Sequence, residues 1–135
     1  MKIVLDTNVL VSGIFFAGPP AEILAACESG RVTLVLTPEV VEEYRRVTDE
    51  LLAHYPDSDA ETVLDRLILG SEIYVPVVLL KPVCSDPDDD MFFACALAGG
   101  AHLIVSGDKH LRNASGIFGI RVLLPRVFVD NHLRS

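Results

Sequence analysis

Residues 3–8 read Ile3-Val4-Leu5-Asp6-Thr7-Asn8, an apolar run that stops at a carboxylate. Such runs are typical of strands buried on both faces of a parallel sheet, and ligands gather where these strands end. A second apolar run stops in the same way, at Ser106-Gly107-Asp108, and the acidic stretch 86–90 opens an unusually apolar segment. These three acidic positions predict one cluster, although Asp6 and Asn8 taken alone could equally form a turn after a strand.

Composition limits the possible functions. With 135 residues and 50% hydrophobic content, the chain is expected to form a single domain over residues 1–135 with a sizeable core. The net charge of -8 disfavours general electrostatic binding of nucleic acid, so an RNA or DNA substrate would need a metal ion or a local basic rim.

The cellular location is predicted from the cysteines and from the apolar runs. Cys27, Cys84 and Cys95 are odd in number and widely spaced, which favours reduced thiols. The N-terminus carries no secretory pattern, and no apolar run approaches the roughly 18 residues that a membrane helix requires. We therefore expect a cytoplasmic protein that does not span a membrane.

Strands and helices are predicted to alternate along the chain. This alternation favours parallel pairing through right-handed crossovers, and hence a three-layer α/β/α sandwich with a central parallel sheet. The predicted strands are residues 3–5, 32–36, 73–79 (an edge or irregular strand because of Pro76), 103–105 and 120–124. The predicted helices are residues 21–29, 38–54, 60–69, 91–98 and 109–113, with an amphipathic segment at 125–133.

Helix geometry selects one acid from the pair Glu42 and Glu43. The apolar face of the predicted helix 38–54 is centred near Tyr44. At 100° per residue, Glu42 points about 160° away from that centre and Glu43 about 100°. Glu42 should therefore face water, whereas Glu43 lies on the rim of the buried face, where it is either a site residue or an ordinary solvated acid.

The acidic stretch 86–90 contains more acids than a helix start requires. Asp86 or Asp88 can cap the helix, with Pro87 in its first turn. Capping does not account for Asp90, the last polar residue before Met91-Phe92-Phe93. Asp90 is therefore the residue of this stretch that we predict for the acidic cluster.

Carboxylates that converge on one spot repel one another and raise some of their pKa values unless a cation is present. All the candidate ligands are hard oxygen donors, because the four histidines are scattered singly and no cysteine joins the set. Oxygen ligands favour Mg²⁺ or Mn²⁺ over zinc. Such an ion makes a bound water nucleophilic and stabilises charge on a phosphate, so phosphodiester hydrolysis is the reaction that fits best.

Taken together and in order, these motifs resemble the PIN domain family. The resemblance is greatest to the toxin components of bacterial and archaeal toxin-antitoxin systems, which are relatives of the VapC ribonucleases. It covers nearly the whole chain, and each motif is weak alone but specific in this order. The motifs are residues 4–12, 37–44, 86–90, 94–98 and 104–111.

The resemblance implies a parallel sheet with the first and fourth strands adjacent at its centre. It also implies the roles of individual residues. The four acidic positions are Asp6, Glu43, Asp90 and Asp108; the metal ligands among them are Asp6, Asp90 and Asp108; Asn8 and Ser106 are supporting polar residues.

By the same resemblance, the expected activity is Mg²⁺- or Mn²⁺-dependent cleavage of RNA, in which water attacks the phosphorus in line. Glu43 would position a second ion or the attacking water. A homodimer and a silencing antitoxin protein are the partners that the family implies. Candidate phosphate contacts, each also readable as a solvated surface charge, are Arg45, Arg46, Lys109 and Arg112.

Three alternatives belong to other classes. A haloacid dehalogenase-like enzyme also has an aspartate after its first strand, but it requires a second aspartate where this chain has Asn8. A receiver domain requires paired acids after the first strand and a phosphoacceptor after the third. The strongest alternative is a non-catalytic PIN-fold module that binds RNA or protein; lost acids would indicate it, and this chain keeps all four.

Overall fold

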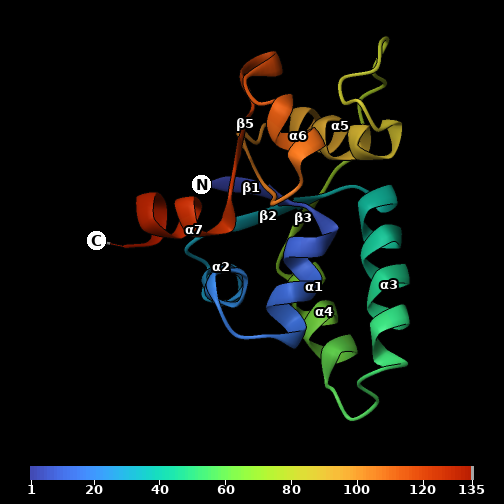
Figure 1. The fold of residues 1–135 in the computed structure, drawn as a ribbon, viewed down its shortest axis with the longest axis vertical. Coiled ribbons are helices and arrows are strands. Elements are labelled where there is room, and N and C mark those ends of the chain that lie inside the picture. The colour runs from blue at the N-terminus through green and yellow to red at the C-terminus, as the bar shows by residue number, and fades with distance from the viewer. Residues whose placement is uncertain (135) are drawn as a thin grey trace.

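Five short parallel strands form the central sheet of the computed structural model, which describes residues 1–134 (Figure 1). Their order across the sheet is β3-β2-β1-β4-β5. The strands are β1 (Lys2–Leu5), β2 (Thr33–Leu36), β3 (Glu72–Ile73), β4 (Leu103–Val105) and β5 (Arg121–Leu123). Every neighbouring pair is parallel, as the alternation of strands and helices predicts.

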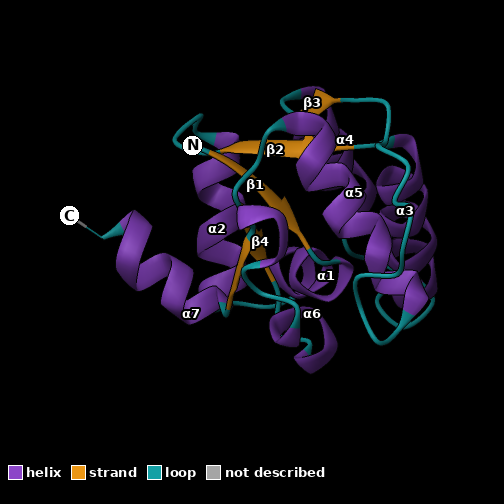
Figure 2. Ribbon diagram, turned by 90° about the horizontal axis from the view of Figure 1, so that it is seen from above, coloured by secondary structure: helices purple, strands orange, loops and turns teal. Residues whose placement is uncertain are grey.

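Helices cover both faces of this sheet (Figure 1, Figure 2). In the view of Figure 1, α5 and α6 lie above the sheet, and α1, α3 and α4 lie below it. The α-helices are α1 (Thr7–Phe15), α2 (Pro19–Glu28), α3 (Pro38–Leu52), α4 (Ala60–Leu69), α5 (Asp90–Gly99), α6 (Lys109–Asn113) and α7 (Pro125–Phe128). Shorter helical segments are η1 (Pro87–Asp89), η2 (Ile117–Gly119) and η3 (Val129–Leu133). The predicted three-layer α/β/α sandwich is confirmed.

The direction of strand order reverses between β1 and β4. Ile3 pairs with Leu103 and Leu5 with Val105, and the backbone N–H of Asp6 donates to the carbonyl oxygen of Val105 at 3.0 Å. In open α/β sheets, ligands bind in the crevice outside the carboxyl ends of strands at such a reversal. The adjacency of the first and fourth strands is confirmed, and Asp6 lies at this point.

Helix α5 packs closely against the sheet. Phe93 and Cys95 are fully buried, and a Cβ atom at Gly99 would lie 2.2 Å from Cγ1 of Val35, so only glycine fits there. The helix ends at Gly99 and is capped by Gly100, whose φ of 69° is in the left-handed region. Because α5 runs antiparallel to the strands, its acidic N-terminus lies at the carboxyl edge of the sheet, where β1 and β4 also end.

The structure differs from the sequence-based prediction at two elements. Helix α1 was not predicted, because Asp6-Thr7-Asn8 resembles a turn; in the structure Thr7 begins a helix that buries Val9 and Leu10. The strand predicted at 73–79 is reduced to two residues of β3, and the chain continues beyond it outside the sheet. Pro76, which cannot donate to a neighbouring strand, explains this early end.

Two expectations from composition can be compared with the structure. Cys27, Cys84 and Cys95 are free thiols. Across residues 1–134, none of the helices alone has the length and hydropathy of a membrane span, although α1 and α2, which meet at a 90° bend, pass such a test as a pair.

Candidate active site

Asp6 and Ser106 are linked across the ends of β1 and β4. Asp6 is buried, and Ser106, with no exposed surface, donates a hydrogen bond from Oγ to Oδ2 of Asp6 at 2.6 Å. The backbone N–H of Asp108 in turn donates to Oγ of Ser106 at 2.9 Å. Ser106 therefore fixes Asp6 and the start of the following loop in one arrangement, which gives a structural basis for its predicted supporting position.

The surroundings of Asp6 raise the pKa of its carboxyl group. Burial is the largest cause, and the negative charge of Asp108 adds to it. The hydrogen bond from Ser106 and the backbone amides of Asn8 and Thr7 lower the pKa and offset part of the increase. The pKa remains raised, so the charged form of Asp6 is incompletely stabilised by the protein alone, and a nearby cation would favour it.

Asp89 lies near the same point. Its pKa is raised to about 6, first by burial and then by the charges of Asp108, Asp86 and Asp6, with His110 opposing the increase. Its Oδ2 atom is buried and has no hydrogen-bond partner among residues 1–134. The charge of Asp108 thus acts on both Asp6 and Asp89, and we refer to these three residues as the acidic cluster.

Asp90, which was predicted for the acidic cluster, directs its carboxylate to the loop that precedes η1. Its Oδ1 accepts a hydrogen bond from the backbone N–H of Cys84 at 2.7 Å, and its Oδ2 accepts one from that of Val83 at 3.1 Å. The carboxylate therefore holds the loop that precedes η1. Asp89 is the residue of this acidic run whose pKa is raised by the charges of Asp108 and Asp6, so we consider it beside Asp90, the residue predicted from the sequence.

Asp108 occupies the N-terminus of α6. Its Oδ1 accepts hydrogen bonds from the backbone N–H groups of His110 at 2.6 Å and Leu111 at 3.3 Å, as a helix cap does. Oγ of Ser85 lies 2.7 Å from Nδ1 of His110, which connects the loop before Asp89 to α6. Capping thus orients the Asp108 carboxylate by one of its oxygens.

Helix α3 positions Glu43 beside a buried anchor. Thr37 caps the helix, and the fully buried Tyr44 donates from its hydroxyl to the carbonyl oxygen of Leu5. Glu42 is exposed and Glu43 is half-buried, so the helix-face argument is confirmed. The Glu43 carboxylate, however, is paired with Arg46, and the structure does not bring it to the acidic cluster.

The four basic residues proposed as phosphate contacts divide into two pairs. Arg45 is paired with Asp65, and Arg46 with Glu43 and Glu50. Lys109 and Arg112 are exposed on α6 and take part in no ion pair within the described part of the chain. Since α6 begins directly after Asp108, these two are the better placed to meet a phosphate.

Comparison with known proteins identifies the family. The family model described as PIN domain matches residues 2–110. This chain belongs to the PIN domain family. Comparison with curated proteins and with solved structures found no match. PIN domains are typically nucleases and usually use divalent metal ions, and the fold and the strand order described above agree with the match.

The acidic cluster of this PIN domain suits a hard divalent cation in its chemistry. All three side chains offer carboxylate oxygens, and the unpartnered Oδ2 of Asp89 together with the raised pKa of Asp6 indicates negative charge that the protein leaves uncompensated. No group of three or more acidic, histidine or cysteine side chains within residues 1–134 is close enough to form a metal site as it stands. An ion would therefore have to draw these carboxylates together.

Asp90 of the PIN domain is expected to stabilise the fold rather than to bind metal. Replacing it with alanine leaves two backbone N–H groups without their acceptor, so we expect a loss of about 1–3 kcal/mol in the free energy of unfolding. Urea titration measures this loss. The matched variant Asp88→Ala changes an exposed neighbour and should cost little. Equal losses in the two variants would contradict the assignment.

Proposed function

We propose that this PIN domain is a Mg²⁺- or Mn²⁺-dependent ribonuclease that hydrolyses phosphodiester bonds. The observation that carries the proposal is the acidic cluster at the reversal of strand order, where Asp6 is buried and the negative charge of Asp108 raises the pKa of both Asp6 and Asp89. Buried carboxylates that repel one another are costly to a fold unless they bind a cation. Metal binding accounts for their placement at this edge of the sheet.

In this proposal Asp6, Asp89 and Asp108 hold the ion. When bound, magnesium or manganese supplies an activated water and neutralises charge on the phosphate. Ser106 keeps Asp6 oriented through its hydrogen bond, and the backbone amides at the start of α6 do the same for Asp108. Burial of Asp6 excludes bulk water from one side of the site.

RNA binding must overcome the net charge of -8. Lys109 and Arg112 follow Asp108 closely in the chain and form no ion pair within residues 1–134, so they provide the kind of local basic rim that a phosphate backbone requires. Glu43 keeps the role that we predicted for it, positioning a second ion or the attacking water, and would leave Arg46 when the site is loaded. Asn8 is exposed at the start of α1, next to Asp6, and can contact substrate.

The biological role that we propose is that of the toxin in a toxin-antitoxin system. Its support is the resemblance of the sequence motifs to VapC-like ribonucleases. A cognate antitoxin protein and a cytoplasmic location belong to the same proposal. A non-catalytic PIN module would share the fold, but its binding of RNA or protein would not depend on a metal ion or on the acidic residues. This dependence can be measured.

The proposal is tested by incubating purified protein with single-stranded and structured RNA, with Mg²⁺ or with EDTA. We expect cleavage only with the metal. The variant Glu43→Gln should lose most of this activity, because the proposal assigns its carboxylate the positioning of a second ion or of the attacking water, whereas Glu42→Gln, at an exposed position, should retain nearly all of it. Gel electrophoresis of end-labelled RNA gives the rates.

The pair of variants contains its own control, since both replace a glutamate on the same helix with its uncharged equivalent. Equal loss of activity in Glu42→Gln and Glu43→Gln would contradict the assigned role of Glu43. Cleavage that continues unchanged in EDTA would contradict the metal-dependent mechanism, and RNA that is bound but not cut would favour the non-catalytic module.

A further inference from the structure

A metal ion in the acidic cluster would not by itself distinguish RNA from DNA. A metal-bound water attacks the phosphorus, and the phosphate is the same in both nucleic acids. An enzyme that selects RNA therefore needs a protein group beside the cluster that contacts the 2′-hydroxyl, which RNA alone carries. A hydroxyl both donates and accepts hydrogen bonds, so an uncharged polar side chain that is exposed and fixed in position suits this contact.

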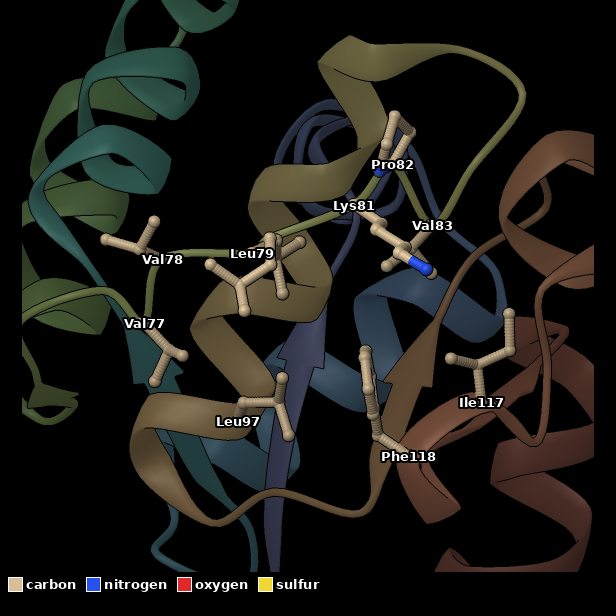
Figure 3. A pocket seen from close by; sticks show the side chains of 10 residues that line it. Val77, Val78, Leu79, Lys81, Pro82, Val83, Leu97, Ile117 and Phe118 are labelled. Atoms are coloured by element: carbon tan, nitrogen blue, oxygen red, sulfur yellow. The ribbon is translucent and has the colours of Figure 1, made fainter.

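The apolar groove over α5 does not offer such a group. Residues 77–83 pass over this helix (Figure 3), and together with side chains that include Leu97 and Phe118 they enclose a hollow of about 460 Å³. Every residue that lines it is apolar except Lys81. No side chain in this lining carries a hydroxyl, an amide or an imidazole, so a contact with the sugar has to come from the side of the acidic cluster.

His110 lies beside the acidic cluster and is held from two sides. Its backbone N–H donates to Oδ1 of Asp108 at 2.6 Å, and its ring nitrogen Nδ1 lies at hydrogen-bond distance, 2.7 Å, from Oγ of Ser85. Its charge lowers the pKa of Asp89, so the ring is within electrostatic range of that carboxylate. An exposed side chain ordinarily changes rotamer freely, whereas both the backbone and the ring of His110 are fixed.

Ser85 approaches His110 from a loop that is itself fixed. The carboxylate of Asp90 accepts hydrogen bonds from the backbone N–H groups of Val83 and Cys84, the two residues that precede Ser85. The hydroxyl of Ser85 is therefore presented to α6 by an ordered segment. Hydrogen bonds that support a side chain in this way hold it in one orientation before a ligand arrives.

The second ring nitrogen of His110 is available to a ligand. Nδ1 faces Ser85, and Nε2 forms no hydrogen bond with any residue of the range 1–134. If Ser85 donates to Nδ1, then Nε2 carries the proton; if Ser85 accepts from Nδ1, then Nε2 offers a lone pair. A 2′-hydroxyl can accept from the first form and donate to the second. The contact therefore requires no charge on the imidazole.

We propose that His110, held in place by Ser85, contacts a ribose 2′-hydroxyl of the substrate and makes the site selective for RNA. This inference rests on the proposed function, because it assigns a sugar contact to the same site. Lys109 and Arg112, which flank His110 on α6, are placed to bind the adjoining phosphates. His110 is the binding residue in this arrangement, and Ser85 is the positioning residue.

The test uses a labelled single-stranded RNA and a series of copies in which one nucleotide at a time lacks its 2′-hydroxyl. Affinity is measured by fluorescence anisotropy in Ca²⁺, a hard ion that binds oxygen ligands as Mg²⁺ does. We expect one position in the series to weaken binding to the wild type about tenfold, the loss that corresponds to one hydrogen bond.

The variant His110→Ala should bind the full RNA about tenfold more weakly and should show no further loss at that position. Ser85→Ala should lose most of the dependence on the 2′-hydroxyl, whereas Ser85→Thr, which keeps the hydroxyl, should retain it. Both side chains are exposed, so all three variants should keep the circular dichroism spectrum and unfolding midpoint of the wild type. A purely structural role of the Ser85–His110 contact would not change the dependence on the 2′-hydroxyl.

The matched control is His102→Ala, which removes an exposed histidine directly before β4, at the edge of the sheet opposite the acidic cluster. It should behave as the wild type does. The inference is overturned if the dependence persists in His110→Ala, if Asn8→Ala removes it and His110→Ala does not, or if the wild type binds every RNA of the series equally. Cleavage in Mg²⁺ is measured separately, so a protein that shows the dependence but does not cut RNA contradicts the proposed function alone.

Discussion

Replacing Asp6 with asparagine is expected to lower metal-dependent RNA cleavage by about 100-fold or more, because the site loses a ligand at its most buried position. The same change should leave the metal-free protein as stable as the wild type or more stable. Burial raises the pKa of Asp6, so its charged form is disfavoured in the fold, and asparagine can still accept the hydrogen bond from Ser106.

Opposite effects on activity and stability distinguish a functional carboxylate from a structural one. Thermal unfolding in EDTA and cleavage rates in Mg²⁺ measure the two quantities on the same samples. Asp57→Asn, the same substitution at an exposed position in the loop between α3 and α4, is the control and should change neither. A large loss of stability in the Asp6 variant without metal would show that Asp6 serves the fold.

Asp89→Asn is expected to lower the affinity for Mn²⁺ at pH 7.5 at least about tenfold, which isothermal titration calorimetry measures. The wild-type affinity should rise with pH through about 6, because Asp89 must lose its proton before it can bind a cation. The variant should lack most of this rise. Asp90→Asn is the matched control, because its carboxylate is held by backbone N–H groups, and it should retain affinity.

The same pKa predicts how stability depends on pH. The pKa of Asp89 is higher in the folded chain than in the unfolded one, so the metal-free protein loses stability as pH rises from about 4 to about 6. In Asp89→Asn this contribution is absent, and the loss over that range should be smaller in EDTA. Excess Mn²⁺ should restore wild-type stability above pH 6. An identical pH profile in the two proteins would contradict the assigned environment of Asp89.

Much of the fold could be predicted because the patterns that specify it are local. The apolar runs 3–5 and 103–105 predict inner strands whatever their neighbours in the sheet. The apolar face around Tyr44 correctly predicts that Glu43 is less exposed than Glu42. Helix α1 escaped prediction because residues 6–8 are as suitable for a turn as for a helix start. The bounds of β3 depend on pairing with β2, which no local pattern reveals.

The sequence by itself determined that acids end two inner strands and open a buried helix, and this is sufficient to expect an acidic cluster at one edge of a parallel sheet. Only the tertiary structure distinguished the acids of the run 86–90, because backbone N–H groups hold the Asp90 carboxylate and the charges of Asp108 and Asp6 act on Asp89. Asp89 ends the short helix η1 and Asp90 begins α5, so the two neighbouring side chains leave the backbone in different directions. The backbone N–H groups of Val83 and Cys84 need a hydrogen-bond acceptor. Asp90 supplies it, which leaves Asp89 near Asp6 and Asp108.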